Sequence, residues 1–590
     1  MKTSIFKSRV RIIFGLLILF CLIVIVRLYF LQIVNGDAYN DKADRQYTNV
    51  SVNTYDRGSI FFQDKNGQNI AAASLKTGYI LALNVREMST DTEAYYNQIS
   101  NIIPIDAATF YAAAAKKDSA YQEIVTEIAS TTEVQKLSQL TLPGIIIENE
   151  KWRYYPGESL AANIIGFIGY DDTGTNLVGR YGLEKYYNDT LARDGSNLYV
   201  NTFAEIFSNI TQNFIDDKGR EGDIVTSIDP EVQSYVEKEI ATTNDKWHSQ
   251  TTGAIVIDPS TGEIYAMATY PTFDPNDFKS ETDVGVFGDP LVSNAYEMGS
   301  IVKALTMAAG LDSGAVTASS TYNDTASIKV DGSTIHNYDD RGRGVIPMQQ
   351  ILNQSLNVGA SYVATKMGKA TMLKYFEGYG IGSETGIDLP SEAAGNISNL
   401  LDNINNSKQV EFDTASFGQG ISMTPIMTVA ALSVLANGGK LIIPHVAKEI
   451  DYKVGLSKTI DYTNEAKQVL KPETSAEITQ MLINVVDQEL DKIIGNSILM
   501  PHYSVAAKTG TAQIARPADE GGGYYPDKYL HSFFGYFPAY KPRFLVFLYT
   551  VDPQDKANPQ ASEYADQTLT IPFFDITRFL INYYQIPPDR

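Results

Sequence analysis

Three short motifs in the second half of this 590-residue chain carry residue types suited to acyl transfer. They are Ser-x-x-Lys at Ser300 and Lys303, Ser-x-Asn at Ser355 and Asn357, and Lys-Thr-Gly beginning at Lys508. A serine hydroxyl is a weak nucleophile near neutral pH and needs a base within hydrogen-bond reach. Residues three apart on a helix share a face, so Lys303 would reach Ser300 if a helix opens there. The set indicates an enzyme that acylates itself on Ser300.

The remaining polar residues suggest how the proton would move. Lys303 acts as general base only if its pKa falls well below the ordinary value of about 10.4. Burial and a second cation nearby both lower a lysine pKa, and Lys508 would supply that cation. We expect Ser355 to relay the proton, and Asn357 to hydrogen-bond the substrate or Lys303.

The Lys-Thr-Gly motif is predicted to lie on a strand at the edge of a sheet. Residues 503–507 lead into it with strand-like character, and Gly510 would leave the backbone open to a ligand. An extended peptide could then add as an extra strand, so Thr509, Gly510 and Thr511 are the predicted substrate-binding residues.

Each motif taken singly has an ordinary structural interpretation. Ser-x-x-Lys on a helix is usually a solvated pair, Ser-Leu-Asn is usually a cap or turn, and Lys-Thr-Gly is usually a loop. Their order and spacing in one chain favour the catalytic interpretation.

Residues around these motifs resemble the class B penicillin-binding proteins, the monofunctional transpeptidases of bacterial wall synthesis. Segments that carry the resemblance are Glu297-Met298-Gly299 (where the family commonly has proline in place of Met298), 253–259, 416–420, Arg57-Gly58-Ser59-Ile60, Arg153-Tyr154-Tyr155-Pro156 and Gly182-Leu183-Glu184. The resemblance runs from about residue 27 to about residue 555. It implies that the backbone N–H groups of Ser300 and Thr511 form an oxyanion hole.

The resemblance implies a peptidoglycan D,D-transpeptidase that takes stem peptides, with a D-Ala-D-Ala donor and an amine acceptor. It also implies inhibition by β-lactam antibiotics, and partnership with a membrane-embedded glycan polymerase and division proteins. The run Ser355-Leu356-Asn357-Val358-Gly359-Ala360 looks more like division enzymes than elongation enzymes.

Three other functions share the motifs. A D,D-carboxypeptidase or a β-lactamase would use Ser300 but pass the acyl group to water. A β-lactam sensor typically needs several membrane spans. A non-catalytic division scaffold would be expected to have lost one of the motif residues, all of which are intact.

An apolar segment near the N-terminus predicts a membrane anchor at residues 12–34. Residues 12–26 hold no charge but rise only about 22 Å as a helix, short of a hydrocarbon core of roughly 30 Å, so the span continues past Arg27. The basic tail, residues 1–11, should stay in the cytoplasm. A cleaved signal peptide is the alternative, but the run is long for one and no small-x-small site follows it. The predicted location is the bacterial plasma membrane, single-pass, with an extracytoplasmic catalytic domain.

Composition narrows the functional class further. The whole chain carries −22 and the tail +4, which leaves −26 for the exported body and disfavours nucleic-acid binding. The single cysteine, Cys21, lies in the predicted span, so the exported part has no disulfide. No histidine or cysteine spacing indicates a metal site, and no cofactor is predicted.

The chain is too long for one core and predicts an α/β (α+β) multidomain protein. We expect a pedestal (dimerisation-type) domain at 35–227 and a transpeptidase domain at 228–590, with a mainly antiparallel sheet sandwiched by helices. A helix is predicted from about 347 to 367, although the family resemblance implies that Ser355-Leu356-Asn357 lies on a loop between helices. A loop is predicted at 395–410, and strands are predicted near 505–513, 532–537 and 543–551. The glycine-rich segment at 518–525 predicts either a mobile flap or a plain hairpin.

Overall fold

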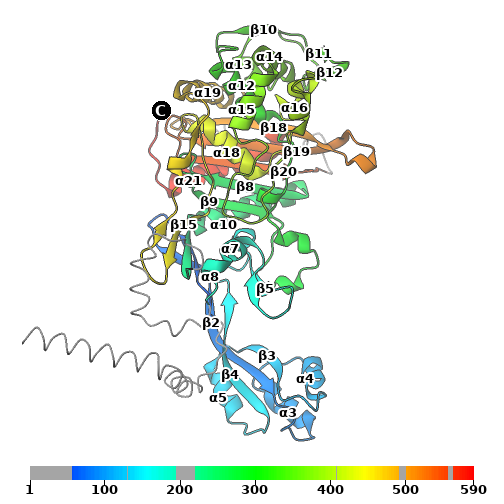
Figure 1. The fold of residues 1–590 in the computed structure, drawn as a ribbon, viewed down its shortest axis with the longest axis vertical. Helices are drawn as coiled ribbons and strands as arrows, with labels where there is room; N and C mark the ends of the chain where they lie inside the picture. The colour runs from blue at the N-terminus through cyan, green and yellow to red at the C-terminus, as the bar shows by residue number, and fades with distance from the viewer. Residues whose placement is uncertain (1–55, 129, 194–219, 407, 491–499, 556–562) are drawn as a thin grey trace, which may run out of the picture. The chain divides into compact units, whose positions relative to one another are not determined.

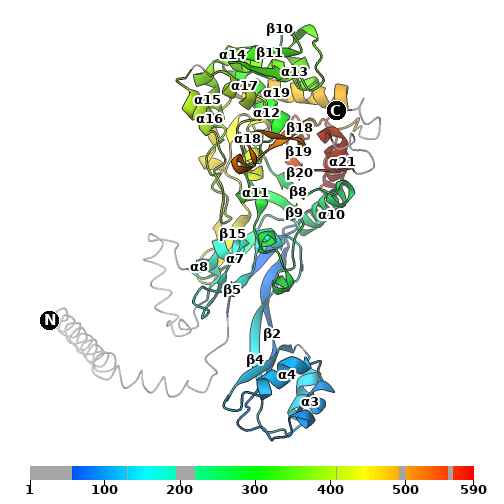
Figure 2. The same ribbon diagram turned by 90° about the vertical axis from the view of Figure 1, so that its right-hand side faces the viewer.

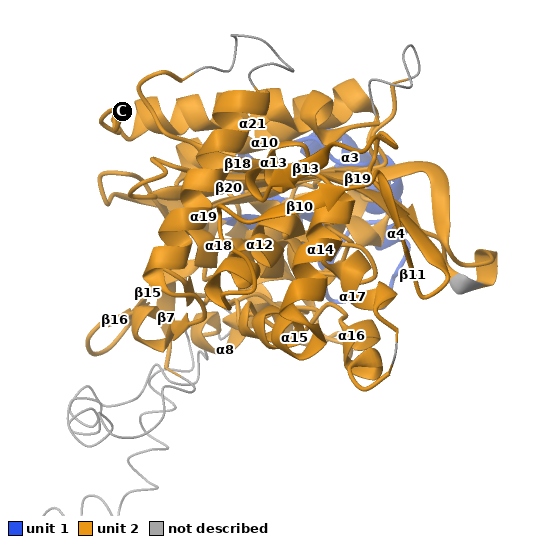
Figure 3. Cartoon of the chain, turned by 90° about the horizontal axis from the view of Figure 1, so that it is seen from above, with its two compact units in different colours: residues 1–55, 78–151 blue, residues 56–77, 152–590 orange. Residues whose placement is uncertain are grey.

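The computed structural model describes residues 56–128, 130–193, 220–406, 408–490, 500–555 and 563–590. Its described residues form two compact units, one of residues 78–151 and the other of residues 56–77 together with 152–590 (Figure 3). The predicted anchor at 12–34 and its cytoplasmic tail lie outside the described residues. From Asp56 onward, no described helix has the length and apolar character to cross a membrane. The predicted boundary near residue 228 stays a prediction.

The smaller unit packs three short helices against parts of three strands, of which β4 (Ile145–Tyr154) pairs with β2. The helices are α3 (Thr92–Ser100), α4 (Ala107–Ala114) and α5 (Thr131–Ser138). The second part of β2 (Asn69–Leu83) pairs antiparallel with β3 (Gln122–Ile128). Their shared core includes the fully buried Leu81 and Phe110. None of the motif residues lies in this unit.

A five-stranded antiparallel sheet organises the larger unit (Figure 1). In spatial order the strands are β18 (Ala506–Ala515), β19 (Tyr524–Phe537), β20 (Phe544–Val551), β8 (Thr251–Ile257) and β9 (Ile264–Tyr270). The strand that carries Lys508 is therefore an edge strand, as the sequence predicts. All eight residues of β20 are buried, which explains its uninterrupted apolar run.

Helices lie on both sides of this sheet (Figure 2), and its alternating side chains belong to two hydrophobic cores. Phe533 belongs to the core formed with α10 (Pro230–Trp247) and α21 (Ala565–Tyr583). Phe534, its neighbour, belongs to the core on the other face. That second core contains α12 (Val302–Asp312), α14 (Asn357–Met367), α18 (Pro425–Ala436) and α19 (Pro472–Val485). Helices thus cover both faces, as predicted, and Ala506, two residues before Lys508, faces the core of α12.

A second sheet joins segments far apart in the sequence. It contains β16 (Lys458–Thr459), β15 (Ala447–Tyr452), β7 (Gly222–Thr226), β1 (Ile60–Gln63) and the first part of β2. Only the β1–β7 pair among these is parallel.

Beside this sheet lies a buried charge cluster built from three of the resemblance segments. The Glu184 carboxylate is 2.6 Å from Nε of Arg57 and 2.5 Å from Nε of Arg153. Tyr155 donates its hydroxyl to the same carboxylate at 3.3 Å. The three charged side chains are at most 1% exposed. One buried carboxylate therefore holds two buried cations.

Two expectations about local structure are wrong. The helix predicted at 347–367 is two helices, α13 (Gln349–Asn353) and α14, because Ser355 adopts a left-handed backbone with φ of 53° between them. The loop predicted at 395–410 contains α16 (Ser398–Asn403) and leads into α17 (Val410–Ala415). The fully buried Leu400 and Phe412 anchor these helices despite the polar sequence.

Replacing Glu184 by Gln should destabilise the larger unit by about 3–5 kcal/mol, because two buried guanidinium groups lose their counter-charge. Denaturant-induced unfolding with a probe in this unit measures the change. Asp172→Asn is the matched control, since its pair with Arg180 is largely exposed and 3.3 Å long, and it should cost less than about 1 kcal/mol. Equal stabilities of the two variants would contradict the assignment.

Candidate active site

The fold brings the three motifs to one place. Ser300 lies in a 3-10 turn, Gly299–Ile301, that runs directly into α12, and Lys303 occupies the first turn of that helix. Ser355 lies in the connection between α13 and α14. Lys508 is the third residue of the edge strand β18. A helix start, a helix connection and a strand edge thus each supply part of the site.

The Ser300 hydroxyl and the two lysine amines form a continuous hydrogen-bonded chain through Ser355. Lys303 Nζ is 2.8 Å from Ser300 Oγ and 3.2 Å from Ser355 Oγ, and it donates to the Ser355 carbonyl at 2.7 Å. Lys508 Nζ donates to Ser355 Oγ at 3.1 Å and to the Thr509 carbonyl at 3.0 Å. A neutral Lys303 amine would use two N–H bonds toward Ser355 and direct its lone pair at the Ser300 proton.

Burial controls the charge of both amines. Lys303 is only 1% exposed to solvent, and Lys508 is only 2% exposed. Burial, together with the positive charge of Lys508, holds the pKa of Lys303 well below its ordinary value. Burial also lowers the pKa of Lys508, to about 8, against the opposing attraction of Asp566. Near neutral pH the arrangement therefore favours a neutral Lys303 beside a protonated Lys508.

Asn357 makes a contact that the sequence did not suggest. Its side-chain amide donates to the backbone carbonyl of His336 at 2.9 Å, and no described contact joins it to Lys303. The neighbouring N–H of Val358 donates to the side chain of buried Asn337 at 3.1 Å. Asn337 in turn donates to Asp324 at 2.9 Å. These bonds attach the start of α14 to the segment after β12 (Ser333–His336).

Glycines allow the nucleophile turn and β18 to approach closely. Gly299 has φ of 63°, and a Cβ there would be 2.5 Å from the Thr511 carbonyl oxygen. A Cβ on Gly510 would be 2.4 Å from Ser532 Oγ and 2.8 Å from the Met298 carbonyl oxygen. Gly510 is therefore required by the packing beneath the strand, and its expected opening of the backbone to a ligand stays a prediction. The close approach places the Thr511 backbone beside the Ser300 turn.

The remaining residues of the Lys-Thr-Gly strand keep a partly accessible edge. Thr509 and Thr511 are half-buried. The Thr511 hydroxyl accepts from the backbone N–H of Ala565 at 3.2 Å, at the start of α21. Because β18 pairs with β19 alone, its other edge has no strand partner among the described residues.

The glycine-rich segment after β18 is a hairpin connection. Ala515 pairs with Tyr524, and the N–H of Arg516 donates to the Gly523 carbonyl at 2.8 Å. The Tyr524 hydroxyl donates to the Glu297 carboxylate at 3.0 Å. Glu297 stands in the Glu-Met-Gly approach segment, but neither motif nor spacing in the sequence signals its link to Tyr524.

Histidines play no part in this hydrogen-bonded chain. His336 is exposed and lies 2.9 Å from Asp340, whereas His445 and His531 are buried. Across the described part of the chain, no three His, Cys, Asp or Glu side chains gather as a metal site would require.

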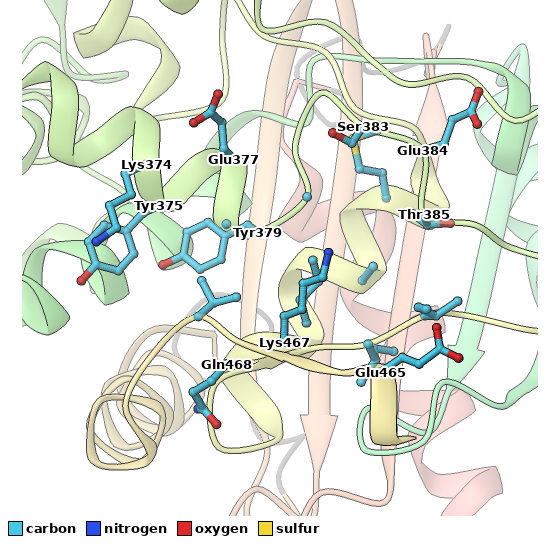
Figure 4. A pocket seen from close by; sticks show the side chains of 18 of the residues that line it. Lys374, Tyr375, Glu377, Tyr379, Ser383, Glu384, Thr385, Glu465, Lys467 and Gln468 are labelled. Atoms are coloured by element: carbon cyan, nitrogen blue, oxygen red, sulfur yellow. The ribbon is translucent and has the colours of Figure 1, made fainter. Parts of the chain in front are cut away.

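A cavity of about 560 Å³ lies elsewhere in the larger unit (Figure 4). Its rim includes Lys374, Glu377 and Lys467, and its lining reaches Asp312 at the far end of α12. None of the predicted catalytic or substrate-binding residues lines it. Catalysis is therefore to be sought at the edge of β18 and not in this cavity.

Comparisons with known proteins show which domain families this chain matches. The chain matches the penicillin-binding protein dimerisation domain over residues 53–222 and the penicillin binding protein transpeptidase domain over residues 252–570. It is 30% identical to stage V sporulation protein D of Bacillus subtilis over 566 residues, covering 94% of this chain and 83% of the relative. It is 27% identical to the peptidoglycan D,D-transpeptidase MrdA of Acinetobacter baumannii, covering 92% and 84%.

The fold is also similar to a solved structure. Penicillin binding protein 3 of Mycobacterium tuberculosis, complexed with aztreonam, superposes with a TM-score of 0.64 at 23% identity. The match covers 91% of this chain and 98% of that one.

Acylation of Ser300 by a penicillin should slow as pH rises through about 8, because Lys508 then loses the positive charge that it holds beside Ser355 and Lys303. The acylation rate constant, followed from about pH 6 to about pH 10, measures this loss. In Lys508→Arg the guanidinium stays protonated over this range, so the alkaline decline should disappear even if the maximal rate is lower. The same alkaline decline in both proteins would contradict the role of Lys508.

Proposed function

This chain belongs to the penicillin-binding proteins with a transpeptidase domain, and we propose that it cross-links peptidoglycan through an acyl-enzyme on Ser300. The observation that carries the proposal is the chain Ser300–Lys303–Ser355–Lys508, in which a nucleophile meets a buried amine at 2.8 Å. Membership of the family supports a D-Ala-D-Ala transpeptidase, as two curated relatives carry the name peptidoglycan D,D-transpeptidase.

In the first half-reaction, Lys303 takes the Ser300 proton as Oγ attacks the carbonyl between the last two D-alanines of a stem peptide. The backbone N–H groups of Ser300 and Thr511 stabilise the oxyanion. Collapse of the tetrahedral intermediate breaks the C–N bond. The leaving D-alanine amine takes its proton from Lys303 through Ser355, and an ester to Ser300 remains.

In the second half-reaction, an amine of a neighbouring stem peptide attacks that ester. Its proton passes to Lys303 and then to Ser300 Oγ, which is released as the new amide forms. The acceptor and donor peptides are held along the free edge of β18 by Thr509, Gly510 and Thr511. A β-lactam ring opens on Ser300 by the same first step and leaves a long-lived ester.

The cellular setting forms part of the proposal. Residues 12–34 would anchor the enzyme in the plasma membrane with its catalytic domain outside. A glycan polymerase in the same membrane would supply the strands that become cross-linked. The likeness of residues 355–360 to division enzymes supports work at the septum. A relative from Caulobacter vibrioides, named probable peptidoglycan D,D-transpeptidase FtsI and 27% identical to this chain, is consistent with that role.

Covalent labelling by a fluorescent penicillin tests the nucleophile. The parent protein should label, with the adduct mapped to Ser300, and Ser300→Ala should not. Ser313→Ala is the matched control, because Ser313 is an exposed serine at the other end of α12. Equal labelling of Ser300→Ala and the parent would rule out Ser300.

Adding an amine acceptor then distinguishes a transpeptidase from a carboxypeptidase or a non-catalytic scaffold. With a D-Ala-D-Ala donor and an amine acceptor, a transpeptidase should form the amide-linked dimer, measured by mass spectrometry. A carboxypeptidase would release only the hydrolysed donor, and a scaffold would release nothing.

A further inference from the structure

Glu297, three residues before the nucleophile, connects the Ser300 turn to two other segments that flank it. Its carboxylate accepts from the backbone N–H of Gly420 at 3.0 Å. It also accepts from the Tyr524 hydroxyl, at 3.1 Å on one oxygen and 3.0 Å on the other. The partners are 123 and 227 residues away in the sequence.

The first segment, the loop at Gly418–Gly420, lies directly on the nucleophile turn. Gly299 donates its N–H to the Gly418 carbonyl at 3.2 Å. A Cβ on Gly418 would be only 2.2 Å from the Gly299 carbonyl oxygen. Three residues before Gly299, Tyr296 exchanges backbone hydrogen bonds of 2.9 and 2.8 Å with Met423. Backbone contacts thus hold this side of the turn, and the hydrogen bond from the Gly420 N–H to the Glu297 carboxylate adds a side-chain contact to them.

The second segment, the β18–β19 hairpin, holds the other side of the same turn. Tyr524 is the first residue of β19 and pairs with Ala515 of β18. Four residues before Ala515 is Thr511, whose carbonyl oxygen faces Gly299. Any shift of this hairpin against the turn would change the separation between the Thr511 and Ser300 backbones.

Neutral donors hold the Glu297 carboxylate. None of the salt bridges found among the described residues involves it. The side chain is half-buried, and this burial raises its pKa. This half-buried carboxylate accepts hydrogen bonds from two other segments and forms no ion pair with any described residue. Its role is therefore to hold those segments in position, and not to add charge to the surface.

We propose that Glu297 is a positioning residue for the oxyanion hole. Its carboxylate joins the Gly420 loop and the β18–β19 hairpin to the Ser300 turn. The inference rests on the proposed acyl-enzyme function. Its specific content is that loss of the Glu297 contacts slows bond formation at Ser300 without weakening the initial binding of the β-lactam, because the described contacts of Glu297 reach Gly420 and Tyr524 and neither Lys508 nor Thr509.

Acylation kinetics with a fluorescent penicillin separate these two quantities. Glu297→Ala should lower the first-order acylation constant by about tenfold or more, since small displacements of an oxyanion donor are costly. The dissociation constant of the non-covalent complex should stay within about threefold of the parent value. Glu297→Gln retains a carbonyl oxygen for Gly420 and an amide for Tyr524, so it should restore most of the rate.

Two further variants make the test decisive. Tyr524→Phe removes one hydroxyl from a folded hairpin and should slow acylation by a smaller factor, about threefold, even if Glu297→Ala fails to fold. Glu377→Ala removes an exposed glutamate of α15 (Lys369–Gly378) and should leave both constants unchanged.

Parental acylation constants in Glu297→Ala and Tyr524→Phe would overturn the proposal, as would an equal loss in Glu297→Gln and Glu297→Ala. A parent protein that does not label at all would overturn the proposed function itself, and this inference with it.

Discussion

Burial of two lysine amines on either side of one serine hydroxyl is the constraint on which the catalytic half of this protein depends. If they were exposed to water, both amines would be protonated near neutral pH. A protonated Lys303 has no lone pair to accept the Ser300 proton. Removing Lys303 from water and placing Lys508 near it make the neutral form accessible. Ser355 lies between the two amines and can relay a proton by accepting one and giving up its own.

The rest of the larger unit can be understood as the means of keeping that site dry and aligned. The five-stranded sheet is buried on both faces, so its edge strand carries Lys508 on a rigid support. The helix α12 is buried almost throughout its length and fixes Ser300 and Lys303 together. Gly299, Gly418 and Gly510 permit backbone approaches that any side chain would block. In this unit, the packing that forms the core therefore also fixes the positions of the catalytic residues.

Elsewhere in the larger unit, a cluster of buried charged side chains links distant segments of the chain. Arg57, Arg153 and Glu184 come from three separate stretches of the chain, yet one carboxylate pairs with the Nε of both guanidinium groups. Such a cluster stabilises little by itself relative to apolar packing, but it tolerates no other arrangement, because a misplaced strand would leave a buried charge unpaired. Glu297 acts by similar logic near the nucleophile, with neutral donors in place of cations.

The sequence by itself determined the family, the nucleophile motifs, the edge position of Lys508 and the antiparallel sheet, because these follow from local patterns and spacing. It misjudged the connection at Ser355, where helix-compatible residues are interrupted by a left-handed backbone. Only the tertiary structure decided that Asn357 turns to His336, that Gly510 is required by the packing beneath it, and that Glu297 meets Tyr524. Periodicity reports which face of an element is apolar, whereas a hydrogen-bond partner 227 residues away is chosen by how the elements pack.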